Sequence, residues 1–97
     1  MSTVMWKFPL PLDDQPHPLP GIVKAAATGP LTDRLMVWAE CDDADPLSPR
    51  AAYQVFGTGH PVPDGATWVA TVADPPFIWH CFEVQPVIGW AEGGDMT

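Results

Sequence analysis

One apolar stretch decides the fold of this 97-residue chain, Phe77-Ile78-Trp79-His80-Cys81-Phe82-Glu83-Val84. Successive side chains of a β-strand point to opposite faces, and here both sets of side chains are mostly apolar. A strand that is apolar on both faces is typical of the centre of a sheet. One face can enter the core, and the other needs a cover that a second copy of so small a protein would supply. We therefore expect a central strand and a homodimer.

The first apolar stretch of the chain predicts an edge strand. Residues 4–10 alternate, with Trp6, Phe8 and Leu10 on one side of the strand. Pro9 has no N–H to donate to a neighbouring strand, and such a residue is found in edge strands or at strand ends.

Four more stretches predict the remaining strands. Residues 35–41 are apolar on both faces except at Glu40, which indicates a second central strand. Residues 51–56 and 67–72 predict the two strands of one hairpin with a long loop between them. Residues 21–28 predict a short strand, because the Gly-Pro turn that follows comes too soon for a normal helix.

Thirteen prolines and eight glycines separate these stretches. Proline fixes φ and lacks an N–H, so this composition leaves little room for helix. Residues 11–21, with four prolines, predict an extended crossing closed by a turn at Pro20-Gly21. The sequence therefore predicts an all-β, mostly antiparallel protein, a small sandwich or partly open barrel of five to six short strands with Pro-rich connections.

Length and aromatic content predict one folded domain. The chain is 46% hydrophobic and includes five Trp and four Phe, which is too apolar for a disordered protein. A chain of this length builds one hydrophobic core. We expect a single β-rich domain over residues 1–84 and a peripheral C-terminal extension over residues 85–97.

Acidic residues outnumber basic residues by twelve to four, giving a net charge of −8. The clustered basic face of a nucleic-acid-binding protein is missing, so we expect no direct binding to nucleic acid. The charge suits a basic partner surface, although the acidic run at residues 42–45 is typical of a solvated loop. An acidic mimic of nucleic acid would need its carboxylates along one face, whereas here they cluster in loops.

The two cysteines, Cys41 and Cys81, bear on the cellular compartment. The sequence contains neither a signal-peptide pattern nor an apolar run of the ~20 residues that a membrane-spanning helix needs. We expect a cytoplasmic protein with two reduced, buried thiols and no membrane contact. A disulfide between them stays open, because only their separation in space decides it.

The loop after residues 51–56 carries the candidate binding residues, which are Gly57, Thr58, Gly59, His60 and Pro61. Two glycines permit positive φ and close approach of backbone N–H groups to a ligand, and the threonine and histidine add polar groups. The loop therefore predicts a cradle for a small anion or a nucleotide phosphate.

The cation for such a cradle would come from Arg50 or Lys24. No helix N-terminus or lysine follows the loop as in known phosphate-binding motifs. The alternative is a simple hairpin tip, in which the glycines only satisfy turn geometry and Pro61 holds His60 extended.

Metal binding and catalysis are not expected. The candidate ligands are His17, His60, His80, Cys41 and Cys81, and they lack the spacing of a zinc site. His80 and Cys81 are neighbours on a strand and therefore face opposite sides. Nothing in the sequence places a cysteine beside a histidine as an activated nucleophile, so we expect neither an enzyme nor a cofactor.

Three motifs resemble a known group of proteins. They are Trp6-Lys7-Phe8-Pro9-Leu10, Gly57-Thr58-Gly59-His60-Pro61 and Trp79-His80-Cys81-Phe82-Glu83, in this order. Over about residues 5–84 the chain resembles a family of small uncharacterised proteins encoded by bacteriophages and prophages, in which W-K-F-P-L, G-T-G-H-P and W-H-x-F-E motifs recur. The resemblance implies a phage origin and no established activity.

Together these features favour a small, acidic, phage-encoded accessory protein of the host cytoplasm. We expect it to act by non-catalytic binding to a host protein, for example one that belongs to a defence system. One alternative is a sponge for a nucleotide or small anion that uses the Gly57–Pro61 loop. The other is a decoration or structural component of the virion.

Overall fold

The computed structural model describes residues 2–45 and 48–84, and all regular structure in this part of the chain is β-strand. The strands are β1 (Thr3–Pro11), β2 (His17–Leu19), β3 (Gly21–Thr28), β4 (Arg34–Asp42), β5 (Ala51–Gly57), β6 (Thr67–Asp74) and β7 (Phe77–Val84). Every strand pairing is antiparallel. The predicted all-β, antiparallel fold class is confirmed. No helix among these residues could span a membrane.

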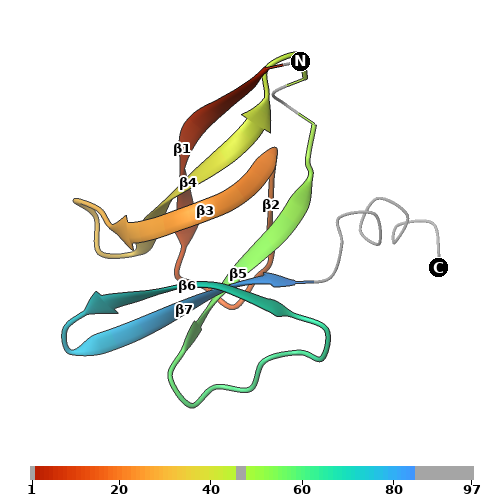
Figure 1. Ribbon diagram of the computed structural model, residues 1–97. Helices are drawn as coiled ribbons and strands as arrows, with labels where there is room; N and C mark the ends of the chain where they lie inside the picture. The colour runs from red at the N-terminus through yellow and green to blue at the C-terminus, as the bar shows by residue number, and fades with distance from the viewer. Residues whose placement is uncertain (1, 46–47, 85–97) are drawn as a thin grey trace.

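The strands form two sheets, which lie one above the other in Figure 1. One sheet has the order β1-β4-β3 and the other the order β2-β5-β7-β6. As predicted, β4 lies between two neighbours, β1 is an edge strand and β7 lies inside its sheet. The sheets are not joined into a closed barrel.

The predicted hairpin of residues 51–56 and 67–72 is wrong, because β7 lies between β5 and β6 and pairs with both. Only Pro75 and Pro76 connect β6 to β7, so these two strands form the tight hairpin. The two apolar faces of β7 favour an interior position, which separates β5 from β6. Residues 58–66 therefore cross from one side of β7 to the other.

The predicted crossing over residues 11–21 contains one additional strand, β2, which raises the count in the described chain above the expected five to six. His17–Leu19 pairs with the start of β5, and Arg50 N–H donates to Leu19 O at 2.8 Å. Pro18 cannot donate to a ladder, which an edge strand tolerates. The predicted C-terminal extension, residues 85–97, lies outside the described residues.

The core lies between the inward faces of the two sheets. Leu10, Leu35 and Val37 fill it from the three-stranded sheet, and Val55 and Cys81 fill it from the four-stranded sheet. Trp6 shares the inward side with Phe8 and Leu10, as predicted, but it is half-exposed because β1 is an edge strand.

A hydrogen bond from β3 to the Tyr53 side chain joins the two sheets inside the core. The Tyr53 hydroxyl on β5 accepts a hydrogen bond from Val23 N–H on β3 at 3.1 Å, and the Tyr53 side chain is fully buried. Val23 lies where a bulge interrupts the β3–β4 register before Ala25. Burial raises the pKa of the Tyr53 hydroxyl. The neutral phenol thus satisfies a backbone donor that would otherwise be buried without a partner.

Replacing Tyr53 with Phe tests this bond. Tyr53→Phe keeps the ring but leaves Val23 N–H buried without a partner, so we expect unfolding to become easier by about 1–3 kcal/mol in urea denaturation. Ser48→Ala is the control, because it removes an exposed hydroxyl that bonds Asp45 in a loop, and we expect a change within about 0.5 kcal/mol. Equal losses for the two variants would show that the inter-sheet bond contributes nothing.

Candidate functional site

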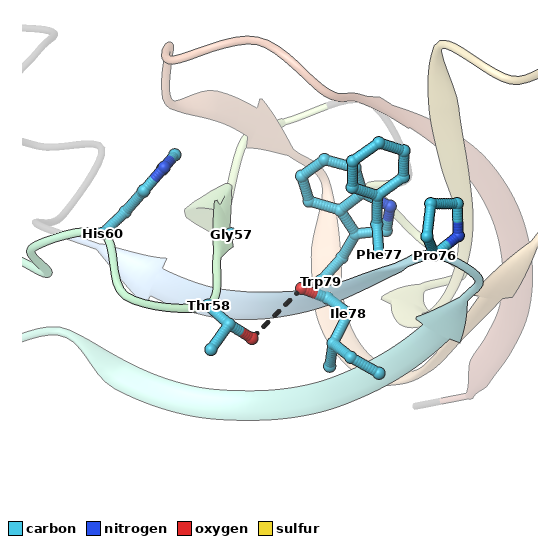
Figure 2. Close-up of a pocket in the computed structure, with 7 residues that line it drawn as sticks. All are labelled: Gly57, Thr58, His60, Pro76, Phe77, Ile78 and Trp79. Carbon is cyan, nitrogen blue, oxygen red and sulfur yellow. Dashed lines mark hydrogen bonds between the residues drawn. The ribbon is translucent and has the colours of Figure 1, made fainter.

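A hollow of about 410 Å³ lies where the chain leaves β5 and passes the start of β7 (Figure 2). Its lining residues are Gly57, Thr58, His60, Pro76, Phe77, Ile78 and Trp79. Three of the five predicted loop residues therefore line one cavity together with the first residues of β7. Gly59 and Pro61 belong to the same loop but do not line the cavity.

The missing side chain at Gly57 leaves space between the His60 and Trp79 rings. The β5–β7 register places Gly57 opposite Trp79. A Cβ atom at Gly57 would lie 3.6 Å from the Trp79 ring and 3.5 Å from His60 Cε1. The turn is closed by Gly59, whose φ of +92° suits glycine, and by His60 N–H, which donates to Gly57 O at 3.1 Å. This turn brings the imidazole back beside Gly57.

Two aromatic side chains form the wall opposite His60. Phe77 and Trp79 are two residues apart on β7, so they share a face, and their rings stack with centroids 5.3 Å apart and an interplanar angle of 28°. Phe77 is 55% exposed. Trp79 Nε1–H donates to the Asp74 carboxylate at 3.2 Å, which holds the indole in place. In Figure 2 the His60, Phe77 and Trp79 rings rise on one side of the strands, whereas Ile78 points to the other.

A chain of hydrogen bonds on the opposite face of the sheet holds the loop. His80 lies between two hydroxyls, with Nε2 2.9 Å from Thr58 Oγ1 and Nδ1 3.0 Å from Thr71 Oγ1. Trp68 Nε1–H donates to Thr71 Oγ1 at 2.9 Å, and Thr58 Oγ1 donates to Ile78 O at 3.4 Å.

The direction of this chain assigns the proton of His80. An indole nitrogen only donates, so the Thr71 hydroxyl accepts from Trp68, and its own hydrogen is available for His80 Nδ1. His80 Nε2–H then donates to Thr58, whose hydroxyl hydrogen goes to Ile78 O. Every group in this chain has a partner when the proton of His80 is on Nε2. His80 therefore connects the loop to β6 and β7 through both ring nitrogens.

The predicted cation Arg50 does not reach this site. It directly precedes β5, and Gly57 ends β5, so seven positions of extended chain, about 23 Å, separate the two. Arg50 instead lines a separate depression beside Glu40 and Asp42.

The other cations are also placed elsewhere. Lys24 lies 4.0 Å from Glu40, and Arg34 bonds Asp33 at 2.9 Å. Lys7 is an exposed residue of β1. All four Lys and Arg residues of the chain are thus described, and none lines the hollow.

Phe77 and Trp79, the aromatic wall, are not among the site residues predicted from the sequence. The signal for it is the same-face spacing of Phe77 and Trp79 in a strand, which marks an aromatic pair. Its position beside Gly57 depends on the β5–β7 pairing, which replaces the hairpin expected from the sequence.

The candidate metal ligands and nucleophiles are separated. His80 and Cys81 face opposite sides of β7, as predicted, and both cysteines are free and buried. Within residues 2–45 and 48–84, no three His, Cys, Asp or Glu side chains gather around a possible metal position. Burial raises the pKa of the Cys81 thiol to about 12. The Cys81 thiol is therefore protonated at neutral pH and packs as a core side chain.

The raised pKa of Cys81 predicts a loss of stability in alkali. The pKa of the thiol is 9.0 in the unfolded chain and about 12 in the folded protein. Its contribution to the free energy of unfolding is therefore present below pH 9 and is lost as the pH rises from about 9 to about 12. By pH 10 the loss is about 1.4 kcal/mol from this group.

The measurement is urea denaturation with reductant at pH 7, 9 and 10. Wild type and Cys81→Ala are compared, because Tyr53 titrates in both proteins while the thiol titrates only in wild type. We expect Cys81→Ala to lose about 1.4 kcal/mol less than wild type between pH 7 and pH 10. The same loss in both proteins would contradict the raised pKa of Cys81.

Comparison with known proteins gives a family and no activity. No curated protein and no solved structure matches the chain. A family model described as a domain of unknown function, DUF7352, matches residues 1–89. The chain belongs to this family, which agrees with the expectation of an uncharacterised family.

Proposed function

We propose that this is a small accessory protein that acts by non-catalytic binding to another protein, and that the hollow beside Gly57 receives the partner. The observation that carries this proposal is the stack of the exposed Phe77 ring on the partly buried Trp79 ring, which lies with His60 around the hollow. Aromatic side chains in pockets supply a large share of the binding energy of protein interfaces. They lose little conformational entropy on binding, because they have few rotatable bonds.

The chemistry of the lining favours binding over catalysis. Among the described residues that line the hollow, His60 is the one titratable side chain. The Thr58 hydroxyl donates its hydrogen to Ile78 O, which leaves none for His80 to remove as a base. The remaining lining is apolar or backbone, and this composition suits a protein-binding pocket.

The resemblance to phage and prophage proteins completes the proposal. With a phage origin, the partner is a host protein in the host cytoplasm, for example a component of a defence system. A net charge of −8 favours a partner with a basic surface and speeds their encounter.

A second candidate function is the binding of a small molecule. The hollow, at about 410 Å³, falls within the range of small-molecule sites. A nucleotide would stack its base on the aromatic wall, but its phosphates would find no Lys or Arg in the lining. A thermal shift with nucleotides, and none with basic peptides, would favour this candidate.

Filling the hollow tests the proposed function. Gly57→Val adds a side chain between the His60 and Trp79 rings, and Gly57 has no positive φ that would strain it. Immobilised wild type should retain a specific protein from a bacterial lysate. Gly57→Val should retain at least tenfold less of that protein. Ala25→Val, on an exposed position of β3, should retain as much as wild type. Equal retention by wild type and Gly57→Val, or no retention by wild type, would overturn the proposal.

We also propose that the protein forms a homodimer through the outer face of the four-stranded sheet. Alternation along β5, β6 and β7 puts Trp68 and Ile78 on this face, and both are exposed. No Asp, Glu, Lys or Arg of these three strands points to it. In a chain with net charge −8, this is the kind of surface where two copies approach without repulsion, and charge depletion is typical of interface centres.

Two matched isoleucines test the dimer. Ile78 on β7 is 42% exposed and Ile22 on β3 is 39% exposed. Sedimentation equilibrium should find a dimer for wild type and for Ile22→Asp, and a monomer for Ile78→Asp, because a buried carboxylate disrupts an apolar interface. A monomeric wild type would rule out the homodimer, and a dimeric Ile78→Asp would rule out this face.

A further inference from the structure

We propose that the hollow beside Gly57 is a slot for an arginine side chain of the protein partner. This inference rests on the proposed function and names the chemical group that enters the site. Three features carry it, which are the spacing of the rings in the hollow, the negative net charge of the chain and the hydrogen bond between the Trp79 indole and Asp74.

The rings leave room for a flat group. The Trp79 and His60 rings both lie about one van der Waals contact from the Cβ position that Gly57 lacks, at 3.6 and 3.5 Å. Figure 2 shows the His60 and Trp79 rings on either side of Gly57. A planar group that enters above Gly57 would therefore contact both rings. The guanidinium of arginine is planar and stacks on aromatic faces, whereas the ammonium of lysine is a compact point charge.

The net charge of the chain favours a cation in the hollow. The chain carries a net charge of −8, and none of its four Lys and Arg residues lines the hollow. An anion would find no opposite charge there. A cation over the face of a tryptophan is attracted by the ring quadrupole.

Asp74 strengthens this preference. Its carboxylate accepts the Trp79 Nε1–H at 3.2 Å, so a negative charge lies at the edge of the indole that forms the wall. A carboxylate bonded to the indole N–H increases the electron density of the ring. The Trp79 ring face that Phe77 does not cover therefore attracts a cation more strongly. The same carboxylate repels a phosphate.

The test uses two blocked peptides with the sequence Gly-Gly-Xaa-Gly-Gly. One has arginine in the middle and the other has citrulline, which has nearly the same shape and no charge. Binding to the full chain is followed by the NMR shift of the Trp79 indole N–H, assigned by its loss in Trp79→Phe. We expect the arginine peptide to bind at least about fivefold more tightly than the citrulline peptide.

Two variants locate the effect. Gly57→Val should reduce binding of the arginine peptide at least fivefold by filling the slot. Asp74→Asn keeps an acceptor for the indole N–H and removes the charge, so it should reduce the preference for arginine over citrulline several-fold. Ala25→Val should bind as wild type does. Amide spectra of each variant show that the fold is retained.

The outcomes separate this inference from the proposed function. No shift with 10 mM arginine peptide, or equal shifts with arginine and citrulline, overturns the arginine slot. If that happens and Gly57→Val still fails to retain the lysate protein, the proposed protein binding stands without the arginine slot. If the arginine peptide binds but no lysate protein depends on Gly57, the slot stands and the proposed function falls.

Discussion

The hydrogen bond between the Tyr53 hydroxyl and Val23 N–H is the constraint on which the rest of the structure depends. It joins the two sheets inside the core, where a hydrogen bond in a low dielectric is strong and an unpaired donor is costly. Tyr53, Val55 and Gly57 lie on the same face of β5, two residues apart. The bond holds Tyr53 against β3, and the β5–β7 register places Gly57, at the end of the same strand, opposite Trp79. The hollow begins at that glycine.

Strand β7 has two roles along one face. Cys81 is fully buried in the core, whereas Phe77, four residues earlier on the same face, is 55% exposed. The core thus ends along the strand, and the same alternation that fills it continues into the aromatic wall of the hollow. A site that is an extension of the core onto a strand end has a rigid wall, since the residues behind it are close-packed.

The sequence predicts the strand types well, because the signals are local. Proline content excludes helices, two apolar faces place β4 and β7 inside their sheets, and Pro9 indicates the edge strand β1. Strand order is not a local property. The β5–β7 pairing depends on the tight turn at Pro75 and Pro76, which the pattern of residues 51–72 does not contain.

The same difference decides how much of the site could be predicted. The composition of the loop indicates Gly57, Thr58 and His60, and all three line the hollow. The position of the aromatic wall follows from pairing and register, which local patterns do not reveal, whereas the distance to Arg50 follows from the length of β5. With one strand pairing predicted wrongly, the predicted site therefore contains the loop but lacks the aromatic wall opposite it.

Two hydrogen bonds hold the loop, and this bears on how it binds. His60 N–H donates to Gly57 O within the turn, and the Thr58 hydroxyl bonds His80 on the outer face of the sheet. Each exposed bond contributes little alone, but together they fix the loop before a partner arrives, which lowers the entropy cost of binding. In the proposed dimer, a second copy would cover His80 and its hydroxyl partners. Removal of these bonds from water strengthens them, so dimer formation and the shape of the hollow would be coupled through Thr58.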